Sequence, residues 1–127
     1  MPVIQFQSLL FEEPVDMASI LASITDKLSE TLAINRDHFT LFWTYIQAHH
    51  YTVGGESKKF QPRDSHPIMI DVLVPDFHDT DMCKAMLCTL SSALSEETDI
   101  PEDNLFINLR FAHSNRVFDQ GEVVTWH

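Results

Sequence analysis

The sequence predicts a small α/β protein in which two β-α-β units form one four-stranded sheet with both helices on one face, an α+β sandwich. Strand-like and helical patterns alternate along the 127 residues in the order β-α-β, loop, β-α-β. The second unit also repeats the first at an offset of about 66 residues, so that Val3 corresponds to Met69 and Phe39 to Leu105. We therefore expect one domain over residues 1–127, with pseudo-repeats at about 2–47 and 68–111.

The first unit begins with a strand at residues 2–11, where Ile4 and Phe6 alternate with glutamines in the period of a half-buried strand. Asp16 is a candidate N-cap for the helix that follows. Apolar residues then recur at helical spacing, which predicts an amphipathic helix. These residues are Met17, Ile20, Leu21, Ile24, Leu28 and Leu32.

A second strand is predicted at residues 38–47, with apolar and aromatic side chains on both of its faces. Such a strand needs burial on both sides or a subunit contact. The loop that follows, residues 48–66, contains Gly54-Gly55 and several basic residues, and we expect it to be exposed and mobile.

The second unit repeats this order with a strand at 68–74, a helix capped by Asp79 or Asp81, and a fourth strand at 105–111. The crossover rule makes the strands parallel within each unit. The tail contains a turn followed by a short strand, Val123 to Trp126, which we expect to pair with another edge or to reach a neighbouring subunit.

Composition limits the classes of partner. The net charge of −11 repels phosphate backbones, so we expect no nucleic-acid partner. No segment approaches the roughly 18 apolar residues of a membrane span, and no signal peptide is visible, so we expect no membrane partner. Cys83 and Cys88 diverge too far around a helix for an easy disulfide, which predicts two reduced core thiols in a cytoplasmic protein.

The chain resembles the tautomerase superfamily, in particular its macrophage migration inhibitory factor-like and carboxymethyl-hydroxymuconate isomerase-like members. The resemblance rests on Met1-Pro2 at the start of the first strand, the two β-α-β units, Gly54-Gly55, and the segment Asp99 to Asn108. Residues 36–40, followed by Pro67 and Asp71, also resemble a bacterial tautomerase-like branch. The resemblance implies a homotrimer with sites at subunit boundaries, and proton transfer next to a carbonyl by an N-terminal proline.

Pro2 is the candidate catalytic residue. Removal of Met1 would leave a secondary amine on a ring of fixed geometry. Apolar surroundings and nearby cations, for which Phe6, Phe106 and the arginines are candidates, would lower the pKa of this amine, so that it could act as a base near neutral pH. A proline after methionine by chance is the alternative, and if Met1 stays in place the Pro2 nitrogen is an amide without basicity.

The candidate substrate-binding residues are Arg36, Phe106, Asn108, Arg110 and Arg116. On the fourth strand, Phe106, Asn108 and Arg110 share the face opposite the apolar residues, which suits a pocket wall. The resemblance assigns Phe106 and Asn108 to the pocket and places Arg36 near a basic substrate-binding position. For Arg110, a structural salt bridge at a subunit contact is the alternative, and Asp71 is expected either to orient the site or to pair with an arginine across the trimer.

The histidines do not have the spacing of a zinc site, and we expect His49, His50, His66 and His78 on the surface, with no metal and no cofactor. The chain departs from the decarboxylase-like and dehalogenase-like members, which carry an arginine after the third strand where this chain has Pro75-Asp76-Phe77. The resemblance, with Pro2 after Met1, implies a tautomerase or isomerase acting on a small oxo acid or its enol. The alternative is a non-catalytic trimeric binding or interaction protein with the same fold.

Overall fold

The computed structural model describes all 127 residues. The elements follow one another in this order: β1 (Val3–Leu9), α1 (Met17–Leu32), a 3-10 helix (Arg36–His38), β2 (Thr40–Ile46), β3 (Thr52–Val53), β4 (Glu56–Ser57), β5 (Ile68–Pro75), α2 (Thr80–Thr98), a 3-10 helix (Glu102–Asn104), β6 (Leu105–Ala112), β7 (Val117–Asp119) and β8 (Glu122–Val124). No helix is long and apolar enough to span a membrane.

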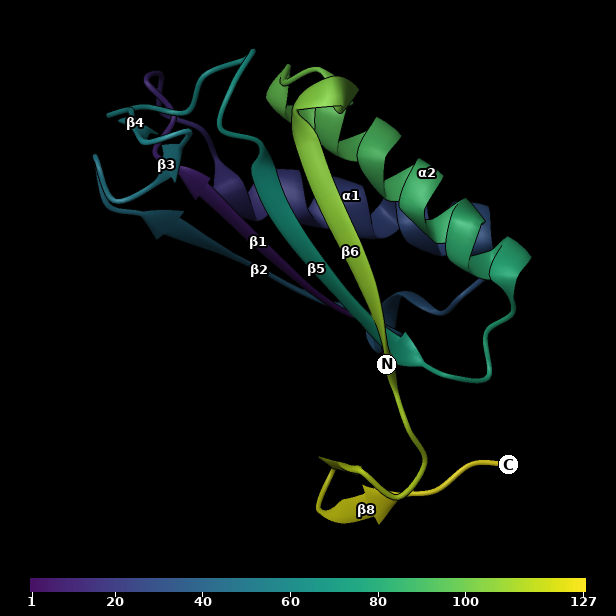
Figure 1. Cartoon of the computed structure of the whole chain (residues 1–127). Helices are drawn as coiled ribbons and strands as arrows, with labels where there is room; N and C mark the ends of the chain where they lie inside the picture. The colour runs from purple at the N-terminus through teal and green to yellow at the C-terminus, as the bar shows by residue number, and fades with distance from the viewer.

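The main sheet has four strands in the order β2-β1-β5-β6, and both helices pack on the same face of it (Figure 1). β2 runs parallel to β1, and β6 runs parallel to β5. The two β-α-β units meet where β1 and β5 pair antiparallel. The predicted fold class and the parallel pairing within each unit are confirmed.

Aspartate side chains cap the start of both helices. Asp16 accepts a hydrogen bond from the backbone N–H of Ser19, as the sequence predicted. Asp79, rather than Asp81, caps α2 and accepts from the N–H of Met82 at 2.8 Å. Asp81 instead lies in the first turn of α2, where its negative charge faces the positive end of the helix dipole.

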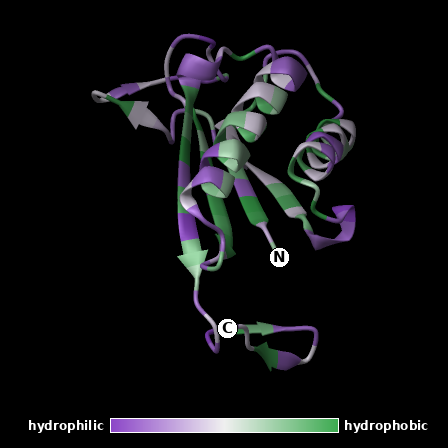
Figure 2. Ribbon diagram, turned by 90° about the vertical axis from the view of Figure 1, so that its right-hand side faces the viewer, coloured by the Kyte–Doolittle hydropathy of each residue, from purple (hydrophilic) through white to green (hydrophobic).

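The core lies between the sheet and the two helices (Figure 2). Alternate residues of β1 and β5 point into it, and the buried stripes of α1 and α2 cover them. Phe6 stacks on Trp43 of β2 with ring centroids 4.9 Å apart, and the Trp43 indole N–H donates to the Ser8 hydroxyl at 3.0 Å. The buried apolar residues include Ile4, Phe6, Ile24, Leu28, Ile68, Val72, Val74, Met86, Leu90 and Leu94.

The second strand is not buried on both faces within the single chain, so a subunit contact stays the prediction for its apolar side chains. β2 lies at the edge of the sheet, and Phe42 and Tyr45 are exposed in the single chain. Phe42 points to the face that carries no helix, because it is paired with Gln5 rather than with a core residue.

The exposed Cys88 also corrects the expectation of two core thiols.

The loop after β2 contains more regular structure than the sequence indicated. β3 and β4 form a hairpin around Gly54 and Gly55, whose φ angles of 58° and 82° suit glycine. The expectation that His66 lies on the surface is wrong, because this side chain is buried and its Nε2 donates to the Glu56 carbonyl at 2.7 Å. Buried Gln61 ties the loop to the sheet by accepting from the Leu9 N–H at 3.1 Å.

The tail forms its own hairpin, which projects beyond the end of the sheet (Figures 1 and 2). The short strand is β8, and it pairs antiparallel with β7. The expectation that it pairs with an edge of the main sheet is therefore corrected. The Trp126 indole N–H donates to the Asp76 carboxylate at 2.7 Å and connects the tail to the end of β5.

Candidate functional site

Pro2 lies directly before β1 and is fully buried. Its carbonyl oxygen accepts a hydrogen bond from the Thr40 N–H at 3.0 Å, which fixes it against the start of β2. By the alternation of β1, Pro2 belongs to the side of Ile4 and Phe6, the side that the helices cover. Phe6 itself stacks on Trp43 in the core, so it is part of the packing behind Pro2.

The amino group of Met1 occupies an environment that disfavours its charge. Burial lowers the pKa of this amine, and the negative charge of Asp119 opposes the effect. The pKa of His78 is lowered mainly by burial and further by the positive N-terminus, while Asp79 raises it. The chain terminus, His78 and the tail residue Asp119 therefore interact electrostatically at one end of the sheet.

A hollow of about 440 Å³ lies where the helices meet the segment after β5. His78 and Phe77 contribute to its wall, and the Phe77 ring lies edge-on to the Trp126 ring with ring centroids 6.0 Å apart. The Asp76 carboxylate bonds both Trp126 and the Nδ1 atom of His113, at 2.7 and 2.9 Å. The residues around the hollow are Thr31, Leu32, Phe77, His78, Asp79, Asp81, Met82 and Ala85.

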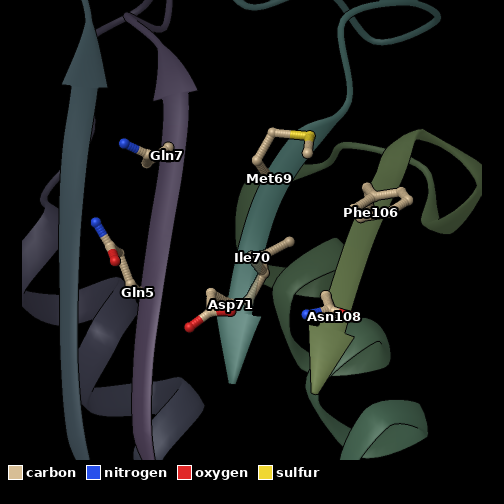
Figure 3. A pocket seen from close by; sticks show the side chains of 7 residues that line it. All are labelled: Gln5, Gln7, Met69, Ile70, Asp71, Phe106 and Asn108. Atoms are coloured by element: carbon tan, nitrogen blue, oxygen red, sulfur yellow. The ribbon is translucent and has the colours of Figure 1, made fainter. Parts of the chain in front are cut away.

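A second depression, of about 180 Å³, lies on the open face of the sheet (Figure 3). Strand register explains its composition, because one row across the sheet joins Gln5, Asp71 and Asn108. The next row joins Gln7, Met69 and Phe106. Phe106 and Asn108 thus lie together on the face that the sequence predicted.

Arg110 is bound to Asp71 within the same chain. Its Nε and Nη2 atoms donate to the two carboxylate oxygens at 2.8 and 2.7 Å. These bonds, followed by the charge of Arg110 and the amide of Asn108, lower the pKa of the Asp71 carboxyl, and partial burial opposes them. Such a bidentate pair fixes the planar guanidinium in one orientation. The expected salt bridge of Arg110, and the expected arginine pairing of Asp71, therefore form within one chain and not across a subunit contact.

The other two candidate arginines lie apart from this depression. Arg36 begins the 3-10 helix before β2, and its guanidinium bonds Asp26 of α1. Arg116 is exposed on the turn that leads to the tail hairpin, and no carboxylate lies within 4.0 Å of its guanidinium. Of the three arginines, Arg116 is the one whose charge is free to meet an anion.

The single chain does not bring Pro2 together with Phe106 and Asn108. The start of β1 lies level with Arg110 of β6, with β5 between the two strands. The backbones of β1 and β6 are therefore two strand spacings apart, roughly 10 Å. Phe106 and Asn108 also face the open side of the sheet, whereas Pro2 belongs to the helix side.

The sequence analysis did not identify two groups of residues at or near the candidate site. Gln5 and Gln7 line the depression, and their place opposite Ile4 and Phe6 on an alternating strand was the available signal. His78 is half-buried beside the N-terminus instead of on the surface, and no local pattern indicates this. No group of three or more metal-ligating side chains gathers anywhere in the chain.

Comparison with known proteins adds the fold family. No protein-family model and no curated protein matches the sequence. Among solved structures, Pt0534 inactivated by 2-oxo-3-pentynoate aligns with a TM-score of 0.79 at 14% identity, covering 96% of this chain and 94% of that one. A symmetric trimer of fused 4-OT aligns with a TM-score of 0.79 at 11% identity and the same coverage.

Malonate semialdehyde decarboxylase, described in its wild-type form, as a proline-to-alanine mutant and in an inactivated form, aligns with a TM-score of 0.69 at 14% identity, covering 95% of this chain and 93% of that one. These proteins are members of the tautomerase superfamily. The chain shares their fold over nearly its whole length, as the sequence resemblance implied.

Proposed function

We propose that this protein is a homotrimeric tautomerase or isomerase that uses Pro2 as the acid–base group for keto–enol proton transfer on a small oxo acid. The observation that carries the proposal is a buried proline directly after Met1, at the start of β1 in a tautomerase fold. Among the proteins of this fold, one is inactivated by an oxo acid, and another was studied as a proline-to-alanine mutant.

The chemistry requires a free secondary amine at Pro2. A methionine before a small residue such as proline is a reasonable substrate for an aminopeptidase. Burial disfavours the charged form of an amine, and the environment of the N-terminus already lowers the pKa of the Met1 amine. A neutral Pro2 amine would take the proton from the carbon next to the carbonyl and return it to another atom of the enolate.

The anionic substrate needs a cation in a chain with a net charge of −11. Arg116 is the strongest candidate, because Arg36 and Arg110 already bond to aspartates. A guanidinium would bind the substrate carboxylate or stabilise the enolate oxygen. It would also disfavour the protonated amine and so lower the pKa of Pro2.

A trimer would complete the site. In one protomer Phe106, Asn108 and the open face lie away from Pro2, and the aromatic side chains of Phe42 and Phe106 are exposed. A neighbouring subunit that brings its own open face next to Pro2 would supply the amide and the aromatic ring. The trimeric assembly of fused 4-OT supports this arrangement.

A non-catalytic trimeric binding protein is the second candidate. It is favoured by the two arginines that are held in ion pairs, and it would follow directly if Met1 stays on Pro2. The two functions differ in turnover, in the state of the Pro2 nitrogen, and in their dependence on pH.

The first prediction concerns catalysis. The protein should interconvert simple enol-pyruvate compounds, and Pro2→Ala should lower kcat/KM by about 100-fold, because a primary amine of freer geometry replaces the secondary amine that the ring holds in place. Ultraviolet absorbance of the enol measures the rate, and intact mass confirms that Met1 is absent. Lys84→Gln, on the exposed face of α2, is the matched control and should keep full activity. Equal turnover by the Pro2→Ala variant would contradict the mechanism.

The second prediction concerns the arginines. Arg116→Ala should raise KM by about tenfold or more and shift the acid limb of the kcat/KM profile to higher pH, because removing a cation raises the pKa of the amine. Arg36→Ala and Arg110→Ala should have smaller effects, since each guanidinium already has a carboxylate partner. Unchanged KM and acid limb in all three variants would show that the arginines are structural.

The third prediction concerns assembly. Light scattering at micromolar concentration should give three times the mass of the 14.6 kDa chain. Phe106→Asp places a charge on the exposed aromatic position of the open face and should shift the mass toward that of a monomer. A wild-type protein with monomeric mass would overturn the proposed assembly and the shared site.

A further inference from the structure

We propose that the protein binds a small carboxylate with an apolar body in a third pocket, anchored by Lys59, at the opposite end of β1 from Pro2. The pocket lies beside the ends of β1 and β2 and has a volume of about 270 Å³. It does not overlap the hollow near the N-terminus or the depression on the open face. Its lining consists of Leu10, Tyr45, Ile46, Gln47, Ala48, Lys59 and Phe60.

The backbone holds the walls of this pocket in place. The Gln61 N–H donates to the Leu10 carbonyl at 2.9 Å, and Leu10 and Phe60 form a parallel bridge. The His49 N–H donates to the Lys58 carbonyl at 2.9 Å. The lysine-bearing segment is therefore attached both to the end of β1 and to the turn after β2, so a ligand would enter a formed pocket.

The lining is mostly apolar and carries no carboxylate. Leu10 is 49% exposed in the single chain, so an apolar ligand that covers it would remove hydrocarbon surface from water. Burial raises the pKa of the Tyr45 phenol, which therefore remains a neutral hydroxyl at physiological pH. The wall thus adds no negative charge that would repel an anion.

Lys59 supplies the one formal charge of the pocket. Its ammonium lies 5.2 Å from the centre of the Phe60 ring, and no carboxylate lies within 4.0 Å of it. An ammonium beside an apolar hollow complements a ligand with a carboxylate at one end and hydrocarbon at the other. The volume is close to the lower end of ordinary ligand sites, which suits a short chain such as hexanoate.

Hexanoate, hexan-1-ol and hexylammonium form a charge series on one hydrocarbon body, and NMR titration of the backbone amides measures their binding to the intact protein. Hexanoate should bind most tightly and shift the amides of Ala48, Lys59 and Phe60. Lys59→Gln should weaken hexanoate by about tenfold and leave hexan-1-ol unchanged, because only the charged contact is lost. Lys58→Gln, the adjacent lysine outside the lining, is the matched control and should bind hexanoate within about twofold of wild type.

Equal affinity for hexanoate and hexan-1-ol, or equal loss in the Lys58→Gln and Lys59→Gln variants, would overturn the proposal. So would amide shifts that cluster around Phe106 or His78 instead of Ala48. Ala48→Leu provides a second variant, because it fills part of the pocket without touching a charge and should weaken both hexanoate and hexan-1-ol. Pro2→Ala should bind hexanoate as wild type does, so this test stands apart from that of the proposed catalysis.

Discussion

The antiparallel pairing of β1 with β5 determines the arrangement of the rest of the molecule. It joins the two β-α-β units, and its register sets Ile4 opposite Val72 on the helix side and Gln5 opposite Asp71 on the open side. Because strands alternate with a period of two, a slip of one residue would place glutamines and an aspartate in the core. This register therefore buries the apolar residues and, by the same constraint, collects Gln5, Asp71 and Asn108 in one row.

The fold could be predicted from the sequence because period and parity decide it locally. Ile4 and Phe6 alternate with glutamines, and Asp16 stands where a helix must begin. The state of His66 could not be predicted in this way. Its burial depends on the Glu56 carbonyl ten residues earlier and on Tyr51, contacts that the loop creates only when it folds. The tail was likewise misplaced because its partner strand was the segment directly before it.

The candidate site was predicted less completely than the fold, because charged side chains form ion pairs with residues that are distant in the sequence. The parity of β6 correctly grouped Phe106, Asn108 and Arg110, yet only the register with β5 shows that Arg110 bonds Asp71. Arg36 meets Asp26 on α1 for the same reason, since the chain turns back along the helix before β2. Once these pairs are formed, Arg116 is the candidate arginine that has no carboxylate partner. The turn that carries Arg116 therefore becomes a candidate for substrate binding, which the spacing of residues in the sequence did not indicate.

The central claim is that Pro2, once Met1 is removed, is the N-terminal residue and that its buried amine accepts a proton near neutral pH. Nitrogen NMR of protein labelled with ¹⁵N-proline measures this directly, because only a free amine titrates. Burial predicts a single transition for the Pro2 nitrogen with a lower midpoint in the folded protein than in urea, since burial disfavours the charged form. A Pro2 nitrogen that does not titrate, or one with the same midpoint in both states, would contradict the account.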